Sequence, residues 1–237
     1  MRIWLSTFAV FILWAPVVRA QDHLVPDVDV FVDPDNYKLM MRHIFARAFE
    51  DSVALRVLVI PSFDTKEYAM GLLVTDKRVE VFVLEPSVTI WNIETIRMYE
   101  SGEAEEVDSE GKAIPLEENV TYQKLKKSTP SDYRKIKAER RARPIPREVA
   151  AEIKRLWDEM LLNVRHPTNP VNGLDGVTYD FSADIKGRGE LSGHIWSPEP
   201  ESKSGRLTTL AETMADYARG KADLRRVIER LKAAREP

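Results

Sequence analysis

The sequence predicts an α+β fold, in which an antiparallel β-meander and a second β-hairpin pack against amphipathic helices. Three observations favour it: β-rich stretches separated by turn-length gaps, a strict alternation of apolar and polar residues near residue 180, and long segments with apolar residues at steps of three and four. Runs of strands and runs of helices, without a regular alternation between them, are typical of α+β proteins.

The composition is that of a folded chain. It has 237 residues, of which 43% are hydrophobic and 31% charged, and its net charge is −3, which excludes a disordered chain. There is no cysteine, which excludes a disulfide scaffold, a cysteine-ligated metal site and a thiol nucleophile. The length fits one domain or two small ones.

The N-terminal residues have the features of a signal peptide. A basic start, an apolar run over residues 3–18 and small residues before a cut after Ala20 are what a signal peptidase recognises. The run is shorter than the roughly 20 residues that cross a hydrocarbon core, which favours cleavage over a membrane anchor. We therefore expect residues 1–20 to be removed and residues 21–237 to be exported without a transmembrane segment. Because exported eukaryotic domains usually carry disulfides, the missing cysteine indicates a bacterial periplasmic or secreted protein.

The first half of the mature chain predicts one helix followed by the meander. Asp33 can cap a helix that begins at Pro34, and apolar residues follow at helical spacing, so an amphipathic helix is expected over residues 34–50. Three β-rich stretches with turn residues between them come next. They cover residues 53–60, 68–75 and 79–84. Residues 88–93 fit either a further strand or the start of a helix.

Charge is segregated in the middle of the chain. Residues 100–118 hold eight acids and one base, and residues 124–147 hold ten bases and two acids. The acidic stretch contains turn residues and is expected to be an exposed loop. Residues 21–237 then form a single α+β domain, or two subdomains, 21–99 and 119–237, that this loop joins.

The second half predicts a helix, a hairpin and two further helices. Apolar residues at steps of three and four over residues 147–165 give the strongest helical pattern in the chain. Val177–Ile185 alternates as a half-buried strand, Gly187 and Gly189 make the turn, and a return strand continues the apolar face. Two helical segments follow, with Gly220 between them. The pattern leaves open whether the two β regions form one sheet or two.

The polar face of this hairpin holds the residues that could carry catalysis. If the apolar faces of its two strands are in register, a hydroxyl, an imidazole and carboxylates lie within cross-strand reach, as in a nucleophile with its base and orienting acid. The expected pairs are Ser182 with His194, Asp180 with Trp196 and Asp184 with Ser192. A hydrolase also needs oxyanion donors, and no Gly-x-Ser-x-Gly occurs. The same residues also fit a solvated hairpin face without a function. Of the two functional interpretations, we favour contact with a ligand or partner, with His194 and Trp196 contributing, over catalysis.

The basic stretch is the second candidate for binding. Arg140, Arg141 and Arg143 lie within it and could contact an anionic envelope component or an acidic protein. The alternative is that this helix-like face pairs with the acidic stretch before it or stays hydrated. Export and the scarcity of stacking aromatics argue against nucleic acid.

No metal or cofactor is expected. The four histidines, which include His194, lie too far apart in the sequence for a helical metal motif. The glycines around the hairpin turn join two strands, whereas phosphate binding needs glycines that open a helix. The absence of a complete catalytic constellation favours an exported, non-catalytic protein that binds another protein or an envelope component, as an inhibitor or immunity-like factor would. The alternatives are the hydrolase and a self-associating structural envelope protein.

Overall fold

The computed structural model describes residues 22–26, 37–62, 65–167 and 175–236. Within them, seven strands form one antiparallel sheet in the order β1-β7-β6-β2-β3-β4-β5, accompanied by six α-helices. The α+β prediction, including its meander, is confirmed. The expected signal peptide and the expected helix cap at Asp33 lie outside the described residues.

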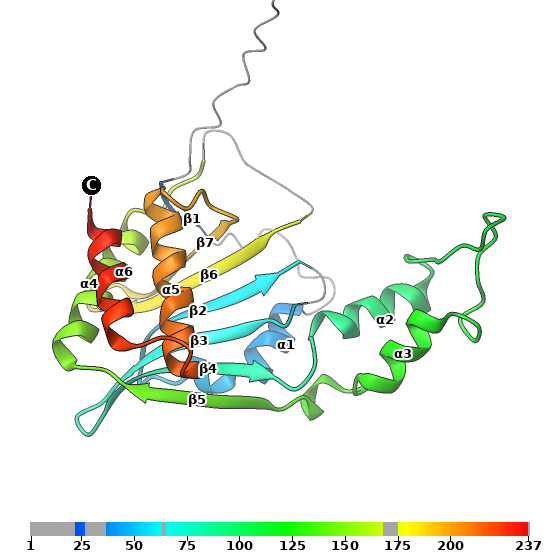
Figure 1. Cartoon of the computed structure of the whole chain (residues 1–237), viewed down its shortest axis with the longest axis horizontal. Coiled ribbons are helices and arrows are strands. Elements are labelled where there is room, and N and C mark those ends of the chain that lie inside the picture. Colours follow the sequence, from blue (N-terminus) through cyan, green and yellow to red (C-terminus); the bar gives the residue numbers. More distant parts are fainter. Residues whose placement is uncertain (1–21, 27–36, 63–64, 168–174, 237) are drawn as a thin grey trace, which may run out of the picture.

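The elements follow one another in the order that Figure 1 colours from blue to red. The strands are β1 (Val25–Pro26), β2 (Val53–Pro61), β3 (Tyr68–Val74), β4 (Val79–Pro86), β5 (Ala138–Pro144), β6 (Val177–Ile185) and β7 (Gly189–Trp196). The helices are α1 (Tyr37–Ile44), α2 (Trp91–Ser101), α3 (Val120–Ser128), α4 (Arg147–Leu162), α5 (Lys203–Arg219) and α6 (Leu224–Arg235). Two 3-10 helices are present, η1 (Ala46–Phe49) and η2 (Tyr133–Lys135). The three expected strands of the meander and the expected strand over residues 177–185 are all formed.

The two β regions belong to one sheet. Strand β6 pairs with β2, with Val57 opposite Phe181, so the second hairpin extends the meander on the β2 side. On the other side, β5 pairs with β4. Strands from both sides of the acidic stretch at residues 100–118 therefore share the same sheet and core, which answers the question of one sheet or two.

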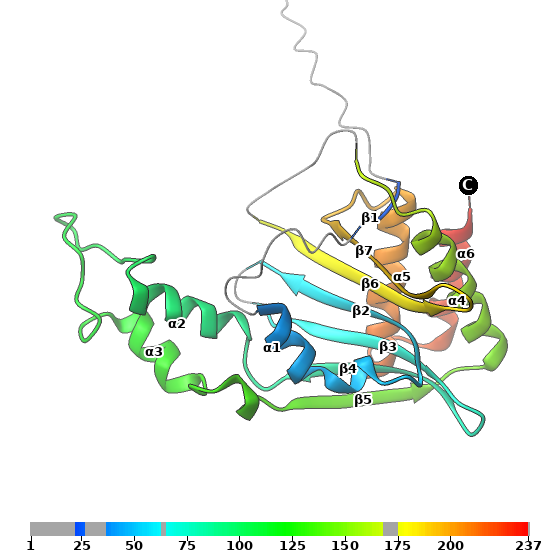
Figure 2. The ribbon, with the colours of Figure 1, turned by 180° about the vertical axis from the view of Figure 1, so that it is seen from behind.

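Each face of the sheet carries helices. Figure 1 shows α4, α5 and α6 over one face, and Figure 2 shows α1 over the other. The larger core lies on the first face, where Trp157 of α4 is fully buried with its ring 5.0 Å from that of Phe181. The smaller core lies under α1 and η1 and includes Phe45, Phe82 and Leu84.

The first helix is shorter than the expected span of residues 34–50. Helix α1 ends at Ile44, and the chain tightens into η1. Side chains three residues apart stand above one another in a 3-10 turn. This places Phe45 and Ala48, both fully buried, on the same side toward the sheet.

Helices α2 and α3 form an arm that projects from the end of the sheet (Figure 1). The arm comprises residues 91–128, and residues 102–119 connect its two helices. Residues 88–93 thus lead into a helix, which begins at Trp91. The expected acidic loop lies at the far end of this arm, between two helices.

Candidate functional site

The polar face of β6 and β7 exists, but its predicted pairing is wrong. Asp180 lies opposite His194, Ser182 opposite Ser192, and Asp184 opposite Glu190. Each strand residue is thus offset by two positions from the expected partner. A shift of two keeps every side chain on its face, because side chains alternate with a period of two. The juxtaposition of Ser182 with His194 that a hydrolase would use is not formed across the strands.

The turn between β6 and β7 explains the shift. Ile185 already pairs with Gly189, so only residues 186–188 form the loop. Gly187 has a φ of 80° and Gly189 a φ of 78°. Glycine adopts this left-handed conformation without a steric cost, and the three-residue loop is centred on Gly187, one residue before the centre of the expected loop at residues 187–189.

The predicted polar residues differ in their exposure. Ser182 is 7% exposed. Asp184 and Ser192 are exposed, whereas His194 and Trp196 are half-buried. The face therefore combines a buried hydroxyl at Ser182 with half-buried and exposed side chains.

Part of this face lines a small cavity beside α1. Asp180, Ser182 and Ser192 contribute to it, and its volume is about 80 Å³. Its lining includes Arg56 of β2, a residue that the sequence reasoning missed. The available signal was a single cation inside an otherwise apolar stretch, since arginine is almost never fully buried unless it is paired.

The arginines at positions 140, 141 and 143 lie on a strand, so the expectation of a helix-like face is wrong. Strand β5 pairs with β4 over its whole length, with Arg141 opposite Val83. Tertiary pairing thus overrides the weak β-propensity of this charged segment. Arg141 and Arg143 are exposed, whereas Arg140 is half-buried.

All three arginines are engaged within the chain. Their partners are the Glu80 carboxylate for Arg140 at 2.6 Å, the Glu139 carboxylate for Arg141 at 3.0 Å and the Ala222 carbonyl for Arg143 at 3.1 Å. The basic stretch was also expected to pair with the acidic stretch. Among the described residues, one ion pair joins them, between Lys126 and Glu100 at 3.1 Å. Most of the basic surface on β5 is therefore held by neighbours in the sheet and helices.

A buried carboxylate fixes the base of the arm. Glu67, which is 1% exposed, accepts hydrogen bonds from the backbone N–H groups of Ile90 and Trp91, each at 2.8 Å. The Tyr37 hydroxyl donates to the same carboxylate at 2.6 Å, and the rings of Tyr37 and Trp91 meet edge to face at 5.5 Å. Burial and the neighbouring carboxylate of Glu67 raise the pKa of Tyr37 well above its ordinary value. Glu67 thus attaches the positive end of α2 to the sheet.

Polar contacts hold the two helices of the arm together. The Tyr122 hydroxyl donates to Glu100 at 2.8 Å and accepts from Lys126 at 2.6 Å, and the Tyr99 and Tyr122 rings lie 5.9 Å apart. The hydrogen bonds from Tyr122 and Lys126 lower the pKa of Glu100. Asn119 caps α3 by accepting from the Tyr122 N–H at 2.8 Å.

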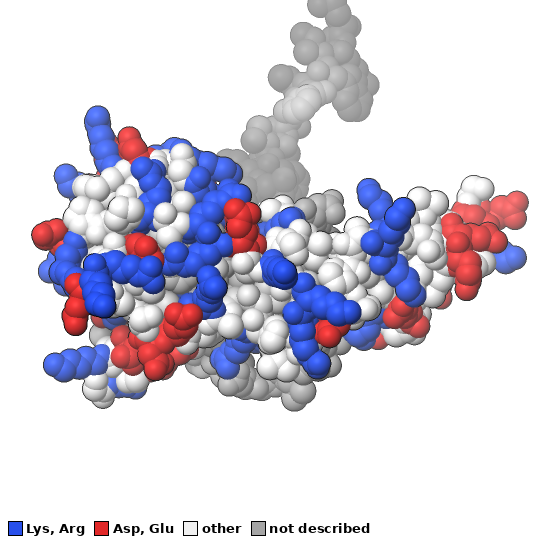
Figure 3. All heavy atoms as spheres, turned by 90° about the horizontal axis from the view of Figure 1, so that it is seen from below, with Lys and Arg blue, Asp and Glu red and all other residues white. Residues whose placement is uncertain are grey.

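The surface of the arm is acidic at its tip and apolar in places. Figure 3 shows acidic side chains gathered at the end of the molecule that the arm forms, and basic side chains spread over the rest of that view. Trp91, Val107 and Val120 are exposed by 41%, 58% and 78%. Of the arm's described apolar and aromatic side chains, Tyr122 is the one that is buried.

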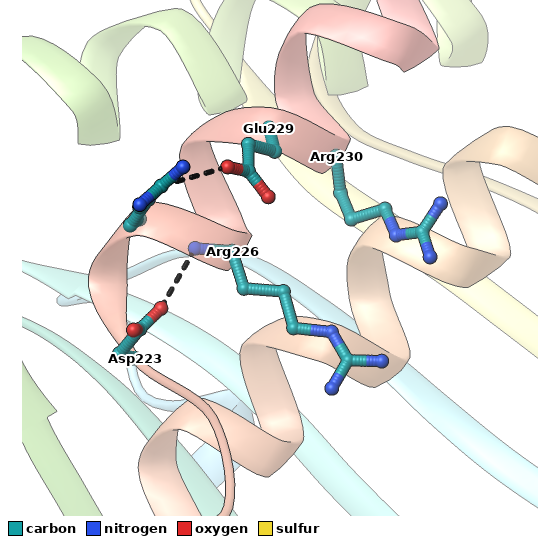
Figure 4. Close-up of a pocket in the computed structure, with 5 residues that line it drawn as sticks. Asp223, Arg226, Glu229 and Arg230 are labelled. Atoms are coloured by element: carbon teal, nitrogen blue, oxygen red, sulfur yellow. Dashed lines mark hydrogen bonds and ion pairs between the residues drawn. The ribbon is translucent and has the colours of Figure 1, made fainter.

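A shallow hollow lies on α6 and carries a second group of charges. Figure 4 shows Arg226 and Arg230 extending over α5 in the same direction, while Asp223 caps the helix through the Arg226 N–H at 2.9 Å. Arg225 pairs with Glu229 at 2.9 Å. These side chains are exposed, which fits a solvated helix face.

Neither a metal site nor a membrane span was found in the described part of the chain. No group of three histidine, aspartate or glutamate residues there could hold a metal ion. None of the helices there is long and apolar enough to cross a membrane.

Three comparisons with known proteins were made once the fold was established. Scans against family models, curated proteins and solved structures each found no match.

Proposed function

We propose that the protein is an exported binding protein that contacts another protein through its arm. The observation that carries the proposal is the surface of residues 91–128. A segment that projects from the sheet leaves Trp91, Val107 and Val120 exposed and concentrates acids at its tip. Exposed apolar groups rimmed by charge are typical of protein interaction sites. Export is supported by the signal-peptide pattern of residues 1–20.

The charge of the arm indicates the chemistry of the partner. The arm contains nine acids and five bases, and eight of those acids lie in residues 100–118. A complementary partner surface carries lysine and arginine, since opposite potentials steer association and fix its orientation. An anionic envelope component is less well supported, because Arg140, Arg141 and Arg143 already have partners within the chain.

Site-specific photo-crosslinking in the native cell tests this proposal. A photoreactive residue placed at Val107 or Val120 is expected to give one discrete crosslinked protein. Both side chains are largely exposed. The same residue at Lys77, in the exposed turn between β3 and β4, is the matched control and is expected to give none.

Other crosslinking patterns would contradict this proposal. Crosslinks confined to a probe at Ser192 would place the contact on the polar face of β6 and β7. A crosslink from Val120 to a second copy of this chain would support the structural envelope alternative. Absence of any product at both arm positions would rule out the arm as a contact surface.

A further inference from the structure

Arg56 is a buried cation in the middle of β2. It is 7% exposed, and its guanidinium carbon lies 4.1 Å from the centroid of the Phe49 ring. Its Nη2 atom donates to the carboxylate of Glu190. A buried guanidinium needs an anion, because removing it from water without one is strongly unfavourable. In this structure Glu190 supplies that anion.

Two further cations line the same cavity. The guanidinium of Arg42 lies 5.7 Å from the centroid of the ring on which Arg56 stacks, and Lys38 is on the next turn of α1. Burial lowers the pKa of Arg56, and the charge of Arg42 lowers it further, while Glu190 opposes both. Two guanidinium groups thus lie at the same aromatic ring, and Arg56 is paired there with the carboxylate of Glu190. This pair of cations favours a negative charge in the cavity.

The size and walls of the cavity limit what that charge can belong to. Its volume is about 80 Å³, which at roughly 30 Å³ per water molecule holds two or three waters or one carboxylate with its first methylene. Its lining includes the polar residues Ser182 and Ser192 together with the apolar residues Met41, Leu58 and Ile60. Polar donors beside an apolar wall match a carboxylate on an aliphatic stem.

Glu190 is placed so that the carboxylate of a ligand can displace its side chain from Arg56. It is the second residue of β7, directly after the turn, and its side chain is 52% exposed. We propose that the cavity binds the carboxylate of an aliphatic acid, with Arg56 as its planar partner in place of Glu190. Arginine favours this exchange because its guanidinium pairs with carboxylates through two parallel N–H bonds. The ligand is a small organic acid or the C-terminus of a peptide, which share this chemistry.

Titration of residues 21–237 with butyrate at constant ionic strength tests the proposal, with NMR shifts as the readout. Saturable shifts are expected at the backbone amides of Arg56 and Ser192. The Glu190→Gln variant is expected to bind butyrate about tenfold more tightly, because the competing internal charge is removed. Arg42→Gln is expected to weaken binding several-fold. Arg225→Gln removes a cation from α6 and is expected to leave binding unchanged.

Two further probes separate the sources of the carboxylate. A short peptide with a free C-terminus that binds more tightly than butyrate, while its amidated form does not bind, identifies a peptide terminus. Equal binding of butyrate and the free peptide identifies a small acid. Both results support the cavity as a carboxylate site.

Three outcomes would overturn the proposal. They are failure of Glu190→Gln to bind more tightly than the parent, binding of butyramide as tight as that of butyrate, and binding of inorganic phosphate as tight as that of butyrate. None of these titrations involves residues 91–128. Their failure would leave the proposed role of the arm untouched, and failure of the crosslinking would leave the cavity untouched.

Discussion

Replacing Glu67 with alanine is expected to lower the free energy of unfolding by about 3–4 kcal/mol. The substitution leaves the N–H groups of Ile90 and Trp91 and the hydroxyl of Tyr37 without their acceptor. Each unpaired buried donor costs about 1–3 kcal/mol. Urea unfolding of residues 21–237 measures the loss. Hydrogen exchange at the amides of Ile90 and Trp91 should also accelerate, because the start of α2 is no longer fixed.

Two matched variants define the cause of that loss. Glu67→Gln keeps one acceptor oxygen but turns an amide donor toward the remaining N–H, so an intermediate loss of about 1–2 kcal/mol is expected. Glu105→Ala removes an exposed acid of the arm and should change nothing measurable. If Glu67→Ala unfolds like the parent, the carboxylate does not fix the arm.

Replacing Trp157 with alanine is expected to lower the free energy of unfolding by about 3–5 kcal/mol, and Tm by roughly 10 °C. Trp157 is fully buried in the larger core, between α4 and the sheet, and its ring packs edge-on against Phe181. Alanine leaves a cavity that the surrounding core can fill only in part. Thermal unfolding followed by circular dichroism measures the shift.

The conservative variant separates packing from hydrogen bonding at this position. The indole N–H of Trp157 has no hydrogen-bond partner among the described residues. Trp157→Phe therefore loses volume but no hydrogen bond, and a cost of about 1–2 kcal/mol is expected. A cost for Trp157→Phe well above about 2 kcal/mol would indicate that the N–H is bonded in solution, because the lost volume alone accounts for less.

Local patterns in the sequence were sufficient for most strands and helices. The apolar spacing over residues 147–165 predicts α4, and the alternation over residues 177–185 predicts β6 with its correct inner face. Both patterns record which side chains of one element are buried, and that information lies within the element itself. The register of β6 and β7 was wrong by two residues, because the three-residue turn is centred on Gly187 and not on Arg188.

The features that the sequence did not predict depend on contacts between distant residues. Strand β5 forms because β4 offers it a backbone edge, although the sequence Glu139 to Arg143 favours no strand. Glu67 acts on backbone groups 23 and 24 residues away. The cavity at Arg56 brings together α1, β2 and the second hairpin. No local pattern in the sequence encodes contacts among these elements, although the lone arginine in an apolar strand was a usable signal.

The proposed function requires that the acids at the tip of the arm bind the partner protein. Glu105, Glu110, Glu117 and Glu118 are exposed, and their side chains make no hydrogen bond or ion pair within the described residues. Replacing all four with glutamine changes the charge of the tip without touching the contacts that hold α2 and α3 together. A control variant neutralises four equally exposed acids outside the arm, which are Glu50, Asp51, Glu148 and Glu201.

The most direct measurement compares the affinity of both variants for the protein that crosslinks to Val120. The tip variant is expected to lose about tenfold or more in affinity at an unchanged Tm, since four ion pairs each contribute about 0.2–1 kcal/mol. The control variant carries the same change in net charge and is expected to bind like the parent. Equal affinities of the tip variant and the parent would contradict the account.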